Sequence, residues 1–193
     1  MNVHLFDMKY SVDTIEQKIE NIFKNKIHTS FLEENCIDLW KGTCFEGYSL
    51  LNNKQKGKYG ENIITDIMRI LGYNVKHPIN TGHDRIIENI KTEIKFSLSQ
   101  TNQKKGIILD NAFAMNHVAV SKDWERLIFV GINFKTDHKM FWFSKDVFEK
   151  HLVKNYFSAQ QGGKKGGNDD FICSSQKLIE LSNSSYVRKL NEW

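Results

Sequence analysis

The sequence is poor in cysteine and proline and has no long apolar run. Its three cysteines, Cys36, Cys44 and Cys173, are odd in number and widely spaced, which argues against a disulfide framework and against a zinc ribbon. Because no run of about 18 apolar residues is present, we expect no membrane span. The first ten residues lack the basic-then-apolar layout of a signal peptide, so we expect a cytoplasmic protein.

The composition is that of a globular domain with a mildly basic charge balance. Of the 193 residues, 40% are hydrophobic and 26% are charged, which suits a single domain over residues 1–193 with a sizeable core. The 27 Lys and Arg residues outnumber the 23 Asp and Glu residues and give a net charge of +4. That excess permits a polyanionic partner without requiring one.

The hydrophobic pattern predicts an N-terminal helical region over residues 1–56. Two capping boxes mark the starts of its helices, Asp13 with Glu16 and Ser30 with Glu33. Residues 41–57 are polar and dotted with glycine, so we expect a loop there.

A core over residues 57–135 and a C-terminal part over residues 136–193 follow. The clearest helix is expected from Lys58 to Leu71, with Gly72 ending it. Further helices are expected at 110–118 and from Ser144 to about Leu152, and strands at 73–76, 85–88, 91–98, 127–132, 139–143 and 171–173. Helices on both sides of a mixed sheet make this an α/β or α+β domain.

The most informative stretch lies in residues 80–99. Side chains two apart on a strand share a face, so Glu93 and Lys95 should stand side by side while the residues between them enter the core. A hairpin turning near Asn89 would bring Asp84 next to Glu93. We therefore expect two carboxylates and one ammonium to converge at one edge of a sheet.

Such a cluster suits metal-dependent hydrolysis of a phosphodiester. Paired carboxylates hold a hard cation such as Mg²⁺ through oxygen ligands, and the cation lowers the pKa of a bound water. Lys95 could orient that water or stabilise charge on the phosphate. Glu61, on the polar face of the preceding helix, could add a third carboxylate to the metal site.

The order of Glu61 on a helix, Asp84 at a strand start and Glu93-x-Lys95 on the next strand resembles the PD-(D/E)xK nuclease superfamily, and within it the type II restriction endonucleases. The pattern covers residues 58 to about 133, and His83 stands where the eponymous motif has proline. The resemblance implies a restriction-endonuclease-like mixed central sheet flanked by helices, with Asp84 and Glu93 as metal ligands and Lys95 serving the attacking water.

The resemblance also implies partners. It implies Mg²⁺ as cofactor, with Mn²⁺ as a substitute, and cleavage of double-stranded DNA at a short specific site. A cognate DNA methyltransferase is the implied genetic partner. A homodimer would suit a palindromic site, although a monomer that nicks twice is also open.

Two groups of polar residues are candidates for DNA contact. Glycines let a backbone approach a phosphate closely, and Lys and amide side chains suit base edges. The glycine-rich stretch within residues 160–170 combines these features, and a second polar stretch follows the catalytic strand. The candidate residues are Lys104, Lys105, Gln161, Lys164, Lys165 and Asn168.

Simpler explanations exist for each of these residues. Glu93 and Lys95 could be a solvated cross-charge pair, Asp84 a turn residue, and Glu61 a complement to the helix dipole. Two other functions are also open: a structure-specific, repair or phage nuclease of the same fold, and a non-catalytic DNA-binding module. The latter would bind DNA in a salt-dependent way without Mg²⁺-dependent cleavage.

Overall fold

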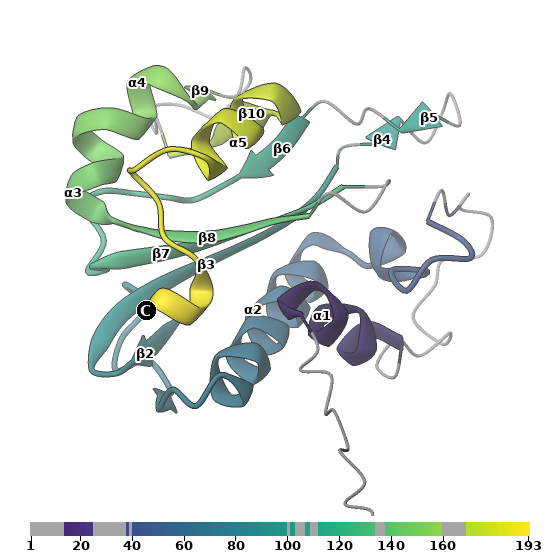
Figure 1. Cartoon of the computed structure of the whole chain (residues 1–193), viewed down its shortest axis with the longest axis horizontal. Helices are drawn as coiled ribbons and strands as arrows, with labels where there is room; N and C mark the ends of the chain where they lie inside the picture. Colours follow the sequence, from purple (N-terminus) through teal and green to yellow (C-terminus); the bar gives the residue numbers. More distant parts are fainter. Residues whose placement is uncertain are drawn as a thin grey trace, which may run out of the picture.

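The protein is built on a mixed five-stranded sheet with helices on both faces (Figure 1). The computed structural model describes residues 14–24, 38, 40–99, 101–102, 107–108, 112–133, 138–159 and 169–193. The sheet contains β1 (Val75–Lys76), β2 (Arg85–Ile87), β3 (Ile90–Leu98), β7 (Arg126–Ile132) and β8 (Lys139–Ser144), in the order β1-β2-β3-β7-β8. The expected α/β class with a mixed central sheet is confirmed.

The centre of the sheet is the parallel pair β3 and β7. Glu93 lies opposite Leu127 in this pair, while every other pairing in the sheet is antiparallel. Residues Leu127 to Ile132 of β7 are all buried, as expected for a nearly continuous apolar strand covered on both faces. The sheet therefore separates two hydrophobic clusters.

Two helices cover one face of the sheet (Figure 1). α1 (Ile15–Lys24) packs against α2 (Asn53–Ile70), and α2 packs on β3. Gly60 permits this approach, because a Cβ at this position would lie only 2.5 Å from Cβ of Phe96. Gly72, with φ of 92°, follows the helix in the left-handed conformation, as its sequence position predicts.

The starts of α1 and α2 differ from the sequence prediction, whereas the predicted cap at Ser144 is confirmed, because its side chain accepts from the N–H of Val147. The side chain of Asn52 and that of Gln55 form a capping box at the start of α2, so residues 53–57, expected to be loop, are helical. In α1, Thr14 and Gln17 exchange the corresponding bonds, one residue later than the predicted Asp13 box. Asp13 and the second predicted box, Ser30 with Glu33, lie outside the described residues.

A smaller sheet and short helices cover the opposite face (Figure 1). Its strands run in the order β6-β10-β9, with β6 (Ala112–Met115), β9 (Ser158–Ala159) and β10 (Phe171–Ser174). The remaining elements are α3 (Lys145–Val147), the π-helical turn η4 (Phe148–Leu152), α4 (Val153–Asn155), α5 (Ser175–Ser182), the 3₁₀ turns η2 (Tyr48–Leu50) and η5 (Leu190–Glu192), and the paired strands β4 (Thr101–Asn102) and β5 (Ile107–Ile108). No helix in this described part is both long and apolar enough to cross a membrane.

The helix predicted over residues 110–118 is wrong. β6 occupies the middle of that stretch and pairs with β10 along its whole length. Phe113 and Met115 are buried in the aromatic cluster while the alternate residues are half-buried, which is the period of a strand. A four-residue apolar stretch is too short for its period to distinguish strand from helix.

Candidate active site at the edge of strand β3

The β2–β3 hairpin brings Asp84 to the edge of β3, as the sequence predicts. Glu88 and Asn89 form its turn with φ values of 49° and 66°. The backbone N–H of Asp84 donates to the carbonyl of Thr92 over 2.9 Å, and its Oδ2 accepts from the N–H of Ile94 over 2.7 Å. β2 begins only at Arg85, so its pairing with β3 does not extend to Ile94. The Asp84 carboxylate accepts the N–H of Ile94 in place of a strand carbonyl.

Glu93 is a buried carboxylate between two lysines. Only 2% of the residue is exposed, and its Oε1 lies 2.7 Å from Nζ of Lys95 and 3.8 Å from Nζ of Lys122. Burial raises the pKa of Glu93, Asp84 raises it further, and the two lysines partly oppose the shift. The expected pairing of Glu93 and Lys95 on one face is confirmed, with Ile94 buried on the other face.

Glu61 approaches the same region from α2, but it is held by an arginine. Its Oε2 lies 3.2 Å from Nη1 of Arg85 and 3.7 Å from Nζ of Lys58. Burial and the charge of Asp84 raise the pKa of Glu61, against the opposing effect of Arg85 and Lys58. Glu61 is therefore close enough to Asp84 to feel its charge, yet it forms an ion pair of its own.

Arg85 connects α2 to the hairpin, and sequence reasoning missed it. The residue is 4% exposed. Its guanidinium donates to Oγ1 of Thr65 over 2.8 Å, to Oδ1 of Asn62 over 3.1 Å and to the carbonyl of Asp84 over 2.6 Å, besides Glu61. No local sequence pattern marks it, because its side-chain partners on α2 lie 20 to 24 residues before it in the sequence. Lys122 was missed for the same reason.

A cleft of about 750 Å³ opens beside this cluster. Its walls come from the first half of α2, the segment around η2, the second half of β3 from Ile94 to Leu98, and the end of β6. Asp84, Lys95 and Glu61 all line it, whereas Glu93 reaches it through its partner Lys95. Within the residues that the structure describes, no group of three or more His, Cys, Asp or Glu side chains is arranged to hold a metal ion.

The expected DNA-contacting residues lie outside the described part of the chain. These are Lys104, Lys105, Gln161, Lys164, Lys165 and Asn168. The segments on either side of the glycine-rich stretch are described: β9 precedes it, β10 follows it, and the two strands pair with each other. Its last two residues reach the cleft wall: the N–H of Val118 donates to the carbonyl of Asp169, and the N–H of His117 donates to Oδ1 of Asp170, both over 2.8 Å.

His83, the residue in the motif's proline position, is buried. It is 3% exposed, and neither ring nitrogen has a hydrogen-bond partner among the described atoms. It is also absent from the residues that line the cleft.

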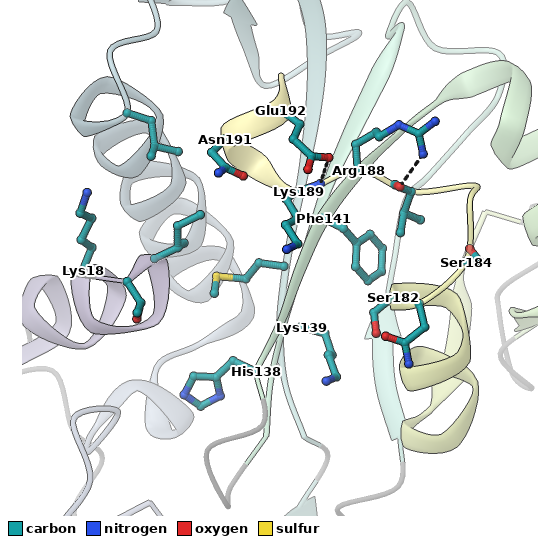
Figure 2. A pocket seen from close by; sticks show the side chains of 16 residues that line it. Lys18, His138, Lys139, Phe141, Ser182, Ser184, Arg188, Lys189, Asn191 and Glu192 are labelled. Carbon is teal, nitrogen blue, oxygen red and sulfur yellow. Dashed lines mark hydrogen bonds between the residues drawn. The ribbon is translucent and has the colours of Figure 1, made fainter. Parts of the chain in front are cut away.

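A second cavity, of about 870 Å³, lies beside β8, which is an edge strand of the sheet (Figure 2). Among the described residues that line it, Glu192 is the only carboxylate, and its Oε2 accepts from the N–H of Lys189. The guanidinium of Arg188 donates to its neighbour's carbonyl at Val187 over 3.0 Å (Figure 2). Without paired carboxylates, this cavity does not offer the chemistry expected of the β3 edge.

Comparison with known proteins adds no assignment to this geometry. No protein-family model matches the sequence, and no curated protein matches it.

Proposed function

We propose that the chain is a Mg²⁺-dependent endonuclease that hydrolyses double-stranded DNA at a short specific sequence, as type II restriction endonucleases do. One observation carries the proposal: Asp84, Glu93 and Lys95 meet at the end of a hairpin, and Asp84 and Lys95 line a cleft there. Burial and the neighbouring charge of Asp84 make ionisation of Glu93 costly, and Lys95 and Lys122 offset only part of that cost. A divalent cation would remove that cost.

The donors present fit Mg²⁺. This ion is commonly held by one or two carboxylates and completes its shell with water and substrate phosphate, so a cluster of three carboxylates is unnecessary. Oδ2 of Asp84 and Oε1 of Glu93 are engaged, while Oδ1 of Asp84 and Oε2 of Glu93 accept no hydrogen bond within the described residues. Those two oxygens would hold the ion, which when bound would polarise the phosphodiester and lower the pKa of a water.

The chain's own residues supply the remaining chemistry. Lys95 lines the cleft with its ammonium fixed on Glu93, where it would orient the attacking water or donate to a phosphate oxygen. Arg85 binds the carbonyl of Asp84 and the carboxylate of Glu61, so it fixes the distance between helix and hairpin. In this arrangement Glu61 is a positioning residue first, and only its Oε1, which does not pair with Arg85 or Lys58, would be offered to a metal ion.

The cleft carries basic side chains that would attract a DNA strand. Lys54 and Lys56 line it at the start of α2. Residues 160–170 connect β9 to β10, and the last of them, Asp170, accepts from the N–H of His117 in the cleft wall. This contact supports the proposed part of the segment in reading DNA. A homodimer and a cognate methyltransferase remain part of the proposal.

The test is cleavage of unmethylated phage DNA with Mg²⁺, with Mn²⁺ and with EDTA. We expect discrete metal-dependent fragments from the wild type and none from Asp84→Asn, Glu93→Gln or Lys95→Gln. Lys177→Gln is the control for the lysine variant, because Nζ of Lys177 donates to the carbonyl of Asn155 and the residue does not line the cleft.

Each other outcome favours a different function. A smear instead of fragments would indicate a structure-specific or non-specific nuclease. Intact DNA with every metal, together with salt-dependent binding, would indicate a non-catalytic DNA-binding module. Full activity in Glu93→Gln or Lys95→Gln would contradict the site assignment.

A further inference from the structure

His117 has a backbone conformation that is unusual for a residue with a side chain. Its φ is 60°, in the left-handed region that L side chains rarely adopt. Within the described residues, two other non-glycine residues have positive φ, Glu88 and Asn89, and both form the tight turn of the β2–β3 hairpin. His117 follows β6 outside any hairpin turn, so turn geometry does not account for it.

Side chains from both directions hold the backbone of His117 in place. Its N–H donates to Oδ1 of Asp170 over 2.8 Å, and its carbonyl accepts from Nζ of Lys122 over 2.9 Å. Lys122 is itself 3.8 Å from Oε1 of Glu93, and its carbonyl accepts from Nζ of Lys145 over 2.7 Å. The strained residue is thereby fixed between the carboxylate cluster and the end of the glycine-rich stretch.

The imidazole does little inside the molecule. The His117 side chain is 81% exposed, and its Nδ1 lies 3.6 Å from Oδ1 of Asp170, beyond a good hydrogen bond. Glycine would adopt the same φ without strain and would keep both backbone hydrogen bonds. The packing of the His117 side chain therefore does not stabilise the fold. The residue nevertheless lines the cleft beside Asn116.

We propose that His117 contacts the DNA strand in the cleft, donating a hydrogen bond from its imidazole to an acceptor on the nucleic acid. This inference rests on the proposed function, because it needs DNA in the cleft. The acceptor is either a phosphate oxygen or a base edge. A phosphate contact contributes to affinity for any sequence, whereas a base contact contributes to the choice of sequence.

His117→Gly tests the proposal, with Asn89→Gly as the matched control. Each variant replaces a left-handed residue by glycine, and Asn89 lies in the hairpin turn away from the cleft. Binding of a short fluorescent duplex is measured by anisotropy in EDTA over a salt series, and cleavage of phage DNA is measured with Mg²⁺. Both variants should melt close to the wild-type temperature, because glycine adopts a left-handed φ without strain.

For a phosphate contact, His117→Gly weakens duplex binding about fivefold or more and lowers the salt slope by about one. For a base contact, duplex binding is unchanged, but the rate at wild-type sites falls about fivefold or more, or new sites are cut. His117→Asn tolerates the same φ and keeps a donor, so it should restore part of either loss.

A His117→Gly protein that matches Asn89→Gly in binding, cleavage rate and fragment pattern overturns the contact and leaves the nuclease proposal standing. A wild-type protein that neither binds nor cleaves DNA overturns both.

Discussion

Replacing Arg85 by methionine should destabilise the protein strongly. Methionine has a similar stem but removes four hydrogen bonds: to Thr65, Glu61, Asn62 and the carbonyl of Asp84. Removing one partner of a buried ion pair costs about 3–5 kcal/mol. Here water can reach Glu61, whose side chain is 25% exposed, and Thr65 keeps its own bond to the carbonyl of Glu61. We therefore expect a loss of about 3 kcal/mol in the free energy of unfolding.

Urea denaturation followed by circular dichroism measures this loss. With a slope of about 2 kcal/mol per molar urea, the midpoint should fall by about 1.5 M. Arg85→Lys keeps the charge but cannot span the four acceptors, so its midpoint should lie between those of Arg85→Met and the wild type. A double-mutant cycle with Glu61→Gln should give a coupling energy of about 1 kcal/mol, since the two side chains are in contact.

A midpoint for Arg85→Met within about 0.3 M of the wild type would refute the reasoning, because a loss that small lies below about 1 kcal/mol. It would mean that the guanidinium is not the buried connection between α2 and the hairpin.

Three further predictions concern stability. Gly60→Ala should cost about 1–2 kcal/mol in urea denaturation, because the new Cβ meets Phe96, whereas Gly57→Ala in the same helix should gain about 0.5–1 kcal/mol, because nothing lies within 4 Å there. Opposite outcomes would place α2 differently on β3. The raised pKa of Glu93 means that the folded state binds more protons than the unfolded state above the ordinary value of 4.5, so stability should fall as pH rises through that window. Glu93→Gln should reduce this pH slope, and an unchanged slope would contradict the burial of an ionised Glu93. Mg²⁺ or Mn²⁺ should raise the melting temperature of the wild type but not of Asp84→Asn, a readout independent of cleavage.

The sequence predicts those parts of the fold that repeat a period over enough residues. The sequence of β3 alternates polar and apolar residues from Glu93 to Leu98, and β7 is an almost unbroken apolar run. The hairpin between β2 and β3 follows from their short separation. β6 has four residues and no such repeat, so its pairing with β10 decided its conformation. The start of α2 was missed because Asn52 and Gln55 lie in a polar stretch that composition alone assigns to a loop.

The same distinction separates the predicted site residues from the missed ones. Glu93 and Lys95 lie on one strand, and Asp84 lies on the neighbouring arm of its hairpin, so local geometry alone brings these three together. Lys122 lies in the segment before β7, and His117 follows β6 of the smaller sheet. They come near the cluster only through tertiary packing, and no spacing in the sequence encodes that contact.

Those long-range residues complete the electrostatics of the site. Two carboxylates at the β3 edge face two lysines, and both lysines lie on the same oxygen of Glu93. Within the described residues, one oxygen of each carboxylate accepts no hydrogen bond, and Asp84 and Lys95 line the cleft. A surface ion pair would contribute little and would need no such arrangement. The asymmetry is the expected result if the lysines neutralise Glu93 in the free protein and a cation joins the carboxylates when DNA is bound.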